Sequence, residues 1–236
     1  MASSKGGKWA LILVLIGIIV AALWWQKRKR DQRRQQTAGR VSAVVSRVST
    51  GDLPLTGEAQ AWKRVNRYPL WETAPGEGKE TDWRGVRMAH DGRTLFVMLD
   101  LAYPVKKKAP DRRGTFILGQ LKMDTDRDPA TGAAEGEGET AIGIDRQVTV
   151  VARREEDDAP LCVGYFLDDC SGGMPCEKIG EWVTTCSTPE MVGHQGEHVA
   201  FGVSISKLGV ELPAEIFFAF EPFGGSGTKF YELTIR

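Results

Sequence analysis

The sequence lacks the local motifs that mark the common enzyme classes. Its 236 residues contain no G-x-S-x-G nucleophile elbow, no H-E-x-x-H zinc motif, no Walker loop and no dinucleotide-binding fingerprint. Carboxylates are numerous, but the run Glu155–Asp158 is contiguous and lies in an expected turn. Such a run is solvated rather than opposed across a substrate. We therefore expect a protein that binds rather than catalyses.

Acidic residues outnumber basic residues outside the first fifty positions. Residues 1–50 hold ten of the 31 Lys and Arg residues but only one of the 31 Asp and Glu residues, so the remaining body is acidic. Proteins that bind nucleic acid need clustered basic side chains for phosphate contacts. The charge distribution therefore excludes nucleic acid as a partner of this body.

One apolar run stands out near the N-terminus. Residues 9–25, WALILVLIGIIVAALWW, carry no charge and have Trp at both ends. At a rise of about 1.5 Å per residue, a helix of this length just crosses a hydrocarbon core of about 30 Å. A cleaved signal peptide is the alternative, but no small-x-small cleavage site follows. We expect a flank over 1–8, a transmembrane helix over 9–25 in the lipid bilayer, and a basic tether and linker over 26–56.

The basic flank and the cysteines favour opposite orientations of this helix. More Lys and Arg follow the helix than precede it, and the positive-inside rule would then place the body in the cytoplasm. Disulfides, by contrast, persist on the oxidising side of a membrane. We give the cysteines more weight and expect a single-pass protein with an extracytoplasmic C-terminal domain.

Four cysteines lie within 25 residues of one another, on two strand-like arms joined by a Gly-rich turn. Facing residues of an antiparallel hairpin have position numbers with a constant sum. That sum is 348 for Cys162 with Cys186 and 346 for Cys170 with Cys176. The spacing predicts two nested disulfides in these pairs. A zinc site is the alternative, although the usual CxxC spacing is absent.

The body alternates between apolar and polar residues, as strands do. The runs VRMAH and TLFVMLDLA are joined by Asp91–Arg93, a hairpin turn signal, and further short strands follow at close spacing. No long amphipathic helix interrupts them. The pattern predicts an all-β domain over 57–236, an antiparallel, jelly-roll-like β-sandwich with an irregular lead-in to about residue 81.

An acidic loop after the strand that ends at Met123 has the oxygen spacing of a calcium loop. Its candidate Ca²⁺ ligands are Asp124, Asp126, Asp128 and Glu135. Pro129 stands where an EF-hand needs Gly, and no helices flank the loop, so it is not an EF-hand. The alternative is a turn in which the Asp side chains accept hydrogen bonds from their own backbone.

Three segments resemble landmarks of the family 9 carbohydrate-binding-module-like (DOMON-like) β-sandwiches. These are DWRGVRMAHDGRTLFVMLDLA, the turn LKMDTDRDPATG, and VAFGVSISKLGVELPAEIFFAFE, which together cover about residues 82–236. The resemblance implies a sandwich that binds sugars, sometimes with structural calcium, that binds haem, or that serves as an accessory domain of envelope proteins. The acidic segment at the usual start of the family is absent.

Each of these possible ligands would be bound by different residues. A glycan would stack on exposed aromatic rings, for which the candidates are Trp62, Trp71, Trp182, Tyr103 and Tyr165. Haem, the less favoured cofactor, would draw on His90, Met88, Met98, Met123 or Met191. An assembly subunit would instead dock another envelope protein through a sandwich face.

Overall fold

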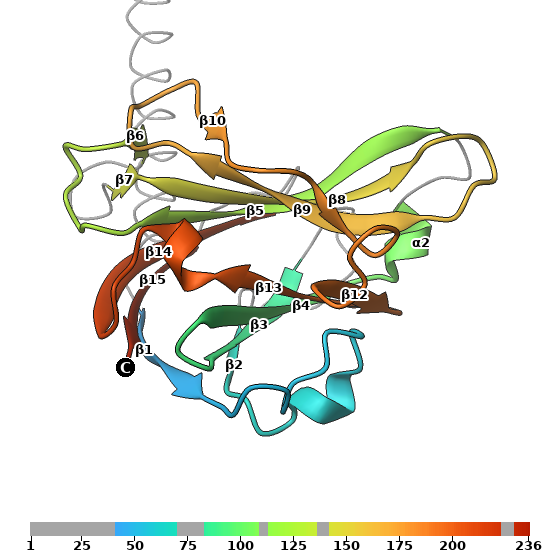
Figure 1. Ribbon diagram of the computed structural model, residues 1–236, viewed down its shortest axis with the longest axis horizontal. Coiled ribbons are helices and arrows are strands. Elements are labelled where there is room, and N and C mark those ends of the chain that lie inside the picture. Colours follow the sequence, from blue (N-terminus) through green and yellow to red (C-terminus); the bar gives the residue numbers. More distant parts are fainter. Residues whose placement is uncertain (1–40, 70–82, 109–112, 136–141, 223–228) are drawn as a thin grey trace, which may run out of the picture. The chain divides into compact units, whose positions relative to one another are not determined.

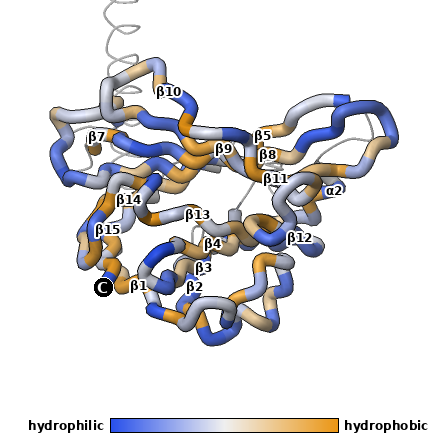
Figure 2. Tube along the Cα trace, viewed as in Figure 1, coloured by the Kyte–Doolittle hydropathy of each residue, from blue (hydrophilic) through white to orange (hydrophobic). Residues whose placement is uncertain are grey.

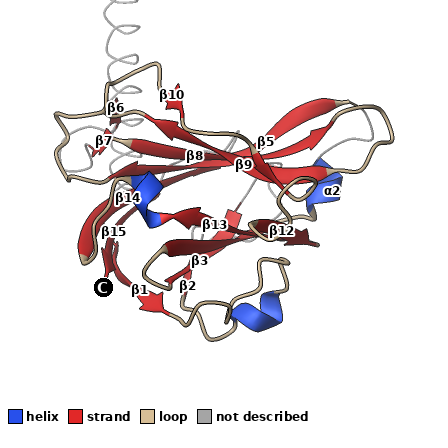
Figure 3. Cartoon of the chain, viewed as in Figure 1, coloured by secondary structure: helices blue, strands red, loops and turns tan. Residues whose placement is uncertain are grey.

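The alternating apolar residues of the body form the strands of an all-β domain, seen here in a computed structural model (Figures 1 and 3). The structure describes residues 41–69, 83–108, 113–135, 142–222 and 229–236. The predicted transmembrane helix over 9–25 lies outside them. Within the described residues, no helix has the length and apolar content needed to span a membrane.

The described strands are β1 (Val41–Arg47), β2 (Arg67–Pro69), β3 (Trp83–His90), β4 (Thr94–Leu101), β5 (Gly114–Asp124), β6 (Ala133–Glu135), β7 (Ile142–Ile144), β8 (Arg146–Arg154), β9 (Cys162–Asp169), β10 (Glu177–Lys178), β11 (Val183–Thr184), β12 (Val192–Gln195), β13 (His198–Ser204), β14 (Ala214–Pro222) and β15 (Lys229–Ile235). The described helical segments are single turns, namely η1 (Ala59–Trp62), α2 (Val105–Lys108) and η3 (Ile205–Leu208).

Most strands belong to one long, curled sheet. Its order is β10-β9-β8-β5-β14-β15-β1-β3-β4-β13-β12, while β11 pairs with β9, β2 pairs with β3, and β6 and β7 form a separate hairpin. One limb of the sheet consists of β10, β9, β8, β5, β14 and β15, and the other consists of β3, β4, β13 and β12 (Figure 1). The prediction of an all-β fold is confirmed, but the chain forms a half-barrel of one mixed sheet rather than an antiparallel sandwich.

Strand β1 is the reason for this difference. Its residues Val41–Val45 pair in parallel with β15, and Ser46 and Arg47 pair in parallel with β3, so β1 joins the two limbs. These residues were predicted to belong to the basic tether over 26–56, because that segment is polar and shows no sustained hydrophobic period. Val45 is nevertheless 2% exposed and belongs to the main core.

The main hydrophobic core lies between the two limbs (Figure 2). Trp83 of β3 is fully buried against Phe220 of β14, and its indole N–H donates to the carbonyl of Leu118 at 3.0 Å. Tyr165 of β9 donates its hydroxyl proton to the carbonyl of Gly202 of β13 at 2.7 Å. These contacts connect the two limbs across the core, in the same way that side chains connect the two layers of a β-sandwich.

Two smaller apolar clusters cover the outer faces of the sheet. The lead-in segment packs Leu53, Trp62 and Val65 on the outer side of β3, β4 and β13. On the other limb, the β6–β7 hairpin packs against Phe217 and Phe230. The acidic loop lies at the base of this hairpin, where the N–H of Gly143 in β7 donates to Asp124 at the end of β5.

Candidate functional site

Asp124 ends strand β5 and points to the outer face of the sheet. The alternation along the strand sends Met123 into the main core and places Asp124 on the side covered by the β6–β7 hairpin. The carboxylate of Asp124 is completely buried, and its Oδ2 accepts a hydrogen bond from the backbone N–H of Gly143 at 3.2 Å. A charged group has therefore been placed in an apolar layer.

Asp145 reaches the same place from the junction between β7 and β8. Its backbone N–H donates to the carbonyl of Met123 at 2.8 Å, which fixes it beside the end of β5. Its Oδ2 accepts hydrogen bonds from the backbone N–H of Thr125 at 2.8 Å and from the Thr125 hydroxyl at 2.9 Å. Asp145 is 4% exposed, so this second carboxylate is also buried.

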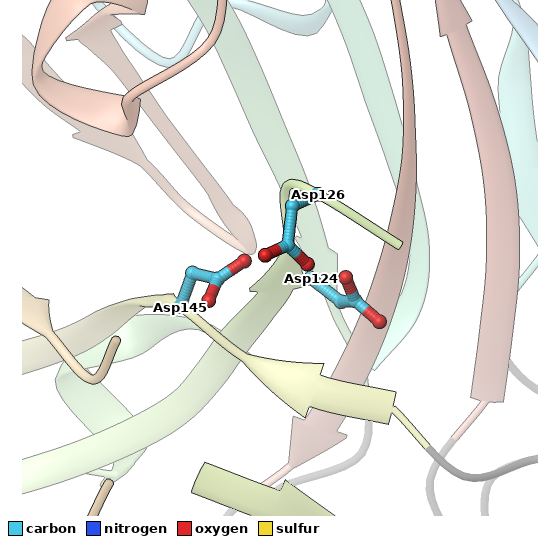
Figure 4. Close-up of side chains that lie close together, drawn as sticks. All are labelled: Asp124, Asp126 and Asp145. Carbon is cyan, nitrogen blue, oxygen red and sulfur yellow. The ribbon is translucent and has the colours of Figure 1, made fainter. Parts of the chain in front are cut away.

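Asp126 completes a group of three carboxylates (Figure 4). Asp124, Asp126 and Asp145 each offer one oxygen, and these oxygens all lie within 4.8 Å of one another. Asp126 is exposed, and its Oδ1 accepts the N–H of Asp128 at 2.8 Å. Oxygen-only donor sets suit hard cations such as Ca²⁺ better than zinc.

The structure keeps only half of the predicted ligand set together. Asp128 does not belong to the group of three carboxylates, and its Oδ1 accepts the N–H of Ala130 at 2.9 Å. Glu135 pairs with the ammonium group of Lys122 at 2.5 Å. Asp145 was not among the predicted ligands, although an Asp inside the apolar stretch over 141–151 was a usable signal.

The surroundings of Asp124 disfavour its charge. Burial raises the pKa of Asp124 to about 6, and the charges of Asp145 and Asp126 act in the same direction, against the backbone N–H groups of Gly143 and Arg127. Its Oδ1 makes no hydrogen bond with any described residue. A buried carboxylate oxygen without a partner calls for a proton or a cation.

The aromatic candidates separate into buried and accessible residues. Trp62 is fully buried with its indole N–H donating to Pro54, and Tyr165 is part of the main core, so neither offers an exposed ring. Tyr103 is half-buried. Trp71 lies outside the described residues. Trp182 is half-buried.

Trp182 lies close to strand β9. Its ring stacks on Phe166, with ring centroids 5.7 Å apart and planes inclined by 23°. A Cβ on Gly164 would lie 2.1 Å from the carbonyl oxygen of Val183 and 2.8 Å from the Trp182 indole nitrogen, so glycine leaves room for the segment that carries Trp182. Two cations flank the rings: the guanidinium carbon of Arg153 is 5.1 Å from the Trp182 centroid, and Nζ of Lys178 is 4.6 Å from that of Phe166.

Polar side chains extend from this aromatic pair across the outer face of β5, β8 and β9. Thr149 faces Phe166 in the register, Gln147 faces Asp168, and Gln120 faces Thr149. Both amides donate to the Thr149 hydroxyl, at 3.3 Å from Gln147 and 3.4 Å from Gln120. Burial raises the pKa of Asp168, against a hydrogen bond from Gln147 and the charge of Lys178. We call Gln120, Gln147, Thr149, Phe166, Asp168 and Trp182 the β8–β9 face.

The haem candidates do not form one ligand set. Met88 belongs to the main core, whereas Met98 belongs to the cluster on the opposite face of the same sheet. His90 is 1% exposed and shares the strand of Met88. Met123 is packed in the main core and Met191 is half-buried. Axial ligands must approach an iron from two sides, and Met88 and Met98 are separated by the sheet itself.

Comparison with known protein families and with curated proteins assigns no family to the chain. A scan against protein-family models finds no match, and a search of curated proteins finds none. Among solved structures, the chain is distantly similar to a crystal structure of a candidate carbohydrate-binding protein from Bacteroides uniformis, with a TM-score of 0.35 and 12% identity. That similarity covers 84% of this chain and 100% of the other. At this level it supports no conclusion about function.

Proposed function

We propose that this protein is a non-catalytic binding module that holds a glycan on the β8–β9 face, outside the cytoplasm. The observation that carries the proposal is the Phe166–Trp182 stack, with amide and carboxylate groups beside it on one face. Aromatic rings pack against the apolar C–H faces of sugars, and amides and carboxylates pair with their hydroxyls.

The two disulfides support the proposed location. Cys162 is bonded to Cys186 and Cys170 to Cys176, the pairs that the hairpin register predicted, and the described residues include no free cysteine. Disulfides are typical of oxidising compartments. The apolar segment over 9–25 would then serve as a membrane anchor that displays the domain.

The test is glycan binding by the detergent-purified full chain, screened on a glycan array and measured by calorimetry and tryptophan fluorescence. We expect Trp182→Ala to weaken binding at least tenfold and Gln147→Ala to weaken it severalfold. Tyr103→Ala is the matched control, because this half-buried aromatic residue is not part of the β8–β9 face.

Two results would count against the proposal. No binding to any neutral or acidic polysaccharide would remove the ligand class. Loss of binding in Tyr103→Ala with retention in Trp182→Ala would place the site elsewhere.

A further inference from the structure

The buried carboxylate of Asp124 has no basic partner among the described residues. The basic side chains of the neighbouring segments are engaged elsewhere. Lys122 pairs with Glu135 and Glu221. Arg127 pairs with Glu215 and Glu232.

The basic residue next to Asp145 is also committed, because Arg146 pairs with Asp169 at 2.6 Å. Three acidic side chains thus converge without a compensating side-chain cation, and two of them are buried. Paired or metal-bound charges are tolerated in such places, whereas isolated ones are costly.

We propose that Asp124, Asp126 and Asp145 form a binding site for a divalent cation, with Ca²⁺ as the expected ion. The unpaired Oδ1 of the fully buried Asp124 is the independent sign that a ligand is needed, beyond the clustering of acids. Ca²⁺ takes six to eight oxygens in flexible geometry, so three carboxylates leave places for backbone carbonyls and water.

This site would join three parts of the chain that are separate in sequence. Asp124 ends β5, Asp126 lies in the following loop, and Asp145 connects β7 with β8. The carbonyl of Asp145 also accepts the N–H of Cys170 at 2.7 Å, beside the Cys170–Cys176 bridge. A bound ion would fix the base of the β6–β7 hairpin against the sheet.

The experiment is titration of CaCl₂ into the full chain, purified in detergent and stripped with EDTA, followed by calorimetry and thermal unfolding. We expect one ion per chain and a rise in Tm on saturation, because an ion that binds only the folded state stabilises it. Asp145→Asn and Asp126→Asn should each weaken Ca²⁺ affinity at least tenfold. Asp126 is exposed, so its variant keeps the test valid if Asp145→Asn folds poorly.

Asp128→Asn is the matched control from the same loop. Asparagine can accept the same hydrogen bond from Ala130, so this variant should keep the Ca²⁺ affinity of the wild type. No binding heat and no Tm shift at millimolar Ca²⁺ would overturn the proposal, as would equal losses in Asp128→Asn and Asp145→Asn. Trp182→Ala should bind Ca²⁺ normally, which separates this result from the glycan test.

Discussion

At the scale of single residues, the described surroundings of Asp124 oppose its charge. Its pKa of about 6 lies above the ordinary aspartate value of 3.8, so the folded protein holds a proton there more tightly than the unfolded chain does. In metal-free protein this group therefore contributes most to stability at low pH. The contribution is lost as the pH rises from about 4 to about 6.

The expected consequence is that Asp124→Asn stabilises the metal-free protein at pH 7, by about 1–3 kcal/mol, because it removes a buried charge. The measurement is chemical denaturation in EDTA at pH 4 and pH 7. The difference between variant and wild type should nearly vanish at pH 4, where the aspartate is protonated in the folded state. A variant less stable than the wild type at pH 7 would contradict this account.

The residues of the acidic cluster show what sequence spacing can and cannot give. Asp124 and Asp126 were predicted because alternate carboxylates on one turn are visible as a local pattern. Asp145 follows Asp124 by 21 positions and is placed beside it by the pairing of β8 with β5, in which Arg146 faces Met123, and no local spacing encodes that pairing. Glu135 has the sequence spacing of a calcium ligand, but its carboxylate forms an ion pair with Lys122 and does not join the acidic cluster.

At the scale of elements, the cysteine-bearing arms follow local rules. Strand β9 pairs with β10 in a register whose position numbers sum to 346, and with β11 in one that sums to 348. The arms are close in sequence, so the two disulfides could be predicted from position numbers alone. Phe166 was missed as a ring partner because strand alternation identifies its face but not the approach of Trp182.

The two bridges should contribute unequally to stability. Cys162–Cys186 closes a separation of 24 residues and Cys170–Cys176 one of 6, and a longer loop loses more unfolded-state entropy. The loop-entropy relation gives about 3.5 and about 2.4 kcal/mol. We expect the Cys162→Ala/Cys186→Ala pair to lower the unfolding free energy by about 1 kcal/mol more than Cys170→Ala/Cys176→Ala. Equal or reversed losses in urea denaturation would refute this.

At the scale of the whole domain, strand β1 decides the architecture. Both of its neighbours, β15 and β3, run parallel to it, and without it the two limbs would each end in an open edge. A strand that pairs in parallel with strands far away in the sequence is not marked by a hairpin turn. Its sequence VSAVVSR is short and follows a basic, polar stretch, and this explains why periodicity indicated the limbs but not their connection.

The domain boundary therefore becomes a testable quantity. A chain that begins at Gly39 keeps β1, whereas one that begins at residue 52 removes it and exposes hydrogen-bonding groups of β15 and β3. We expect the longer chain to unfold cooperatively and the shorter one to lose at least half of its unfolding free energy, or to aggregate through the open edges. Urea denaturation followed by near-ultraviolet circular dichroism measures the unfolding free energy of both chains.

Val45→Ala in the longer chain should lower the unfolding free energy less than the truncation does, because it keeps the strand and shortens only its buried side chain. Equal unfolding midpoints for the two truncated chains would mean that the limbs hold together through the core alone.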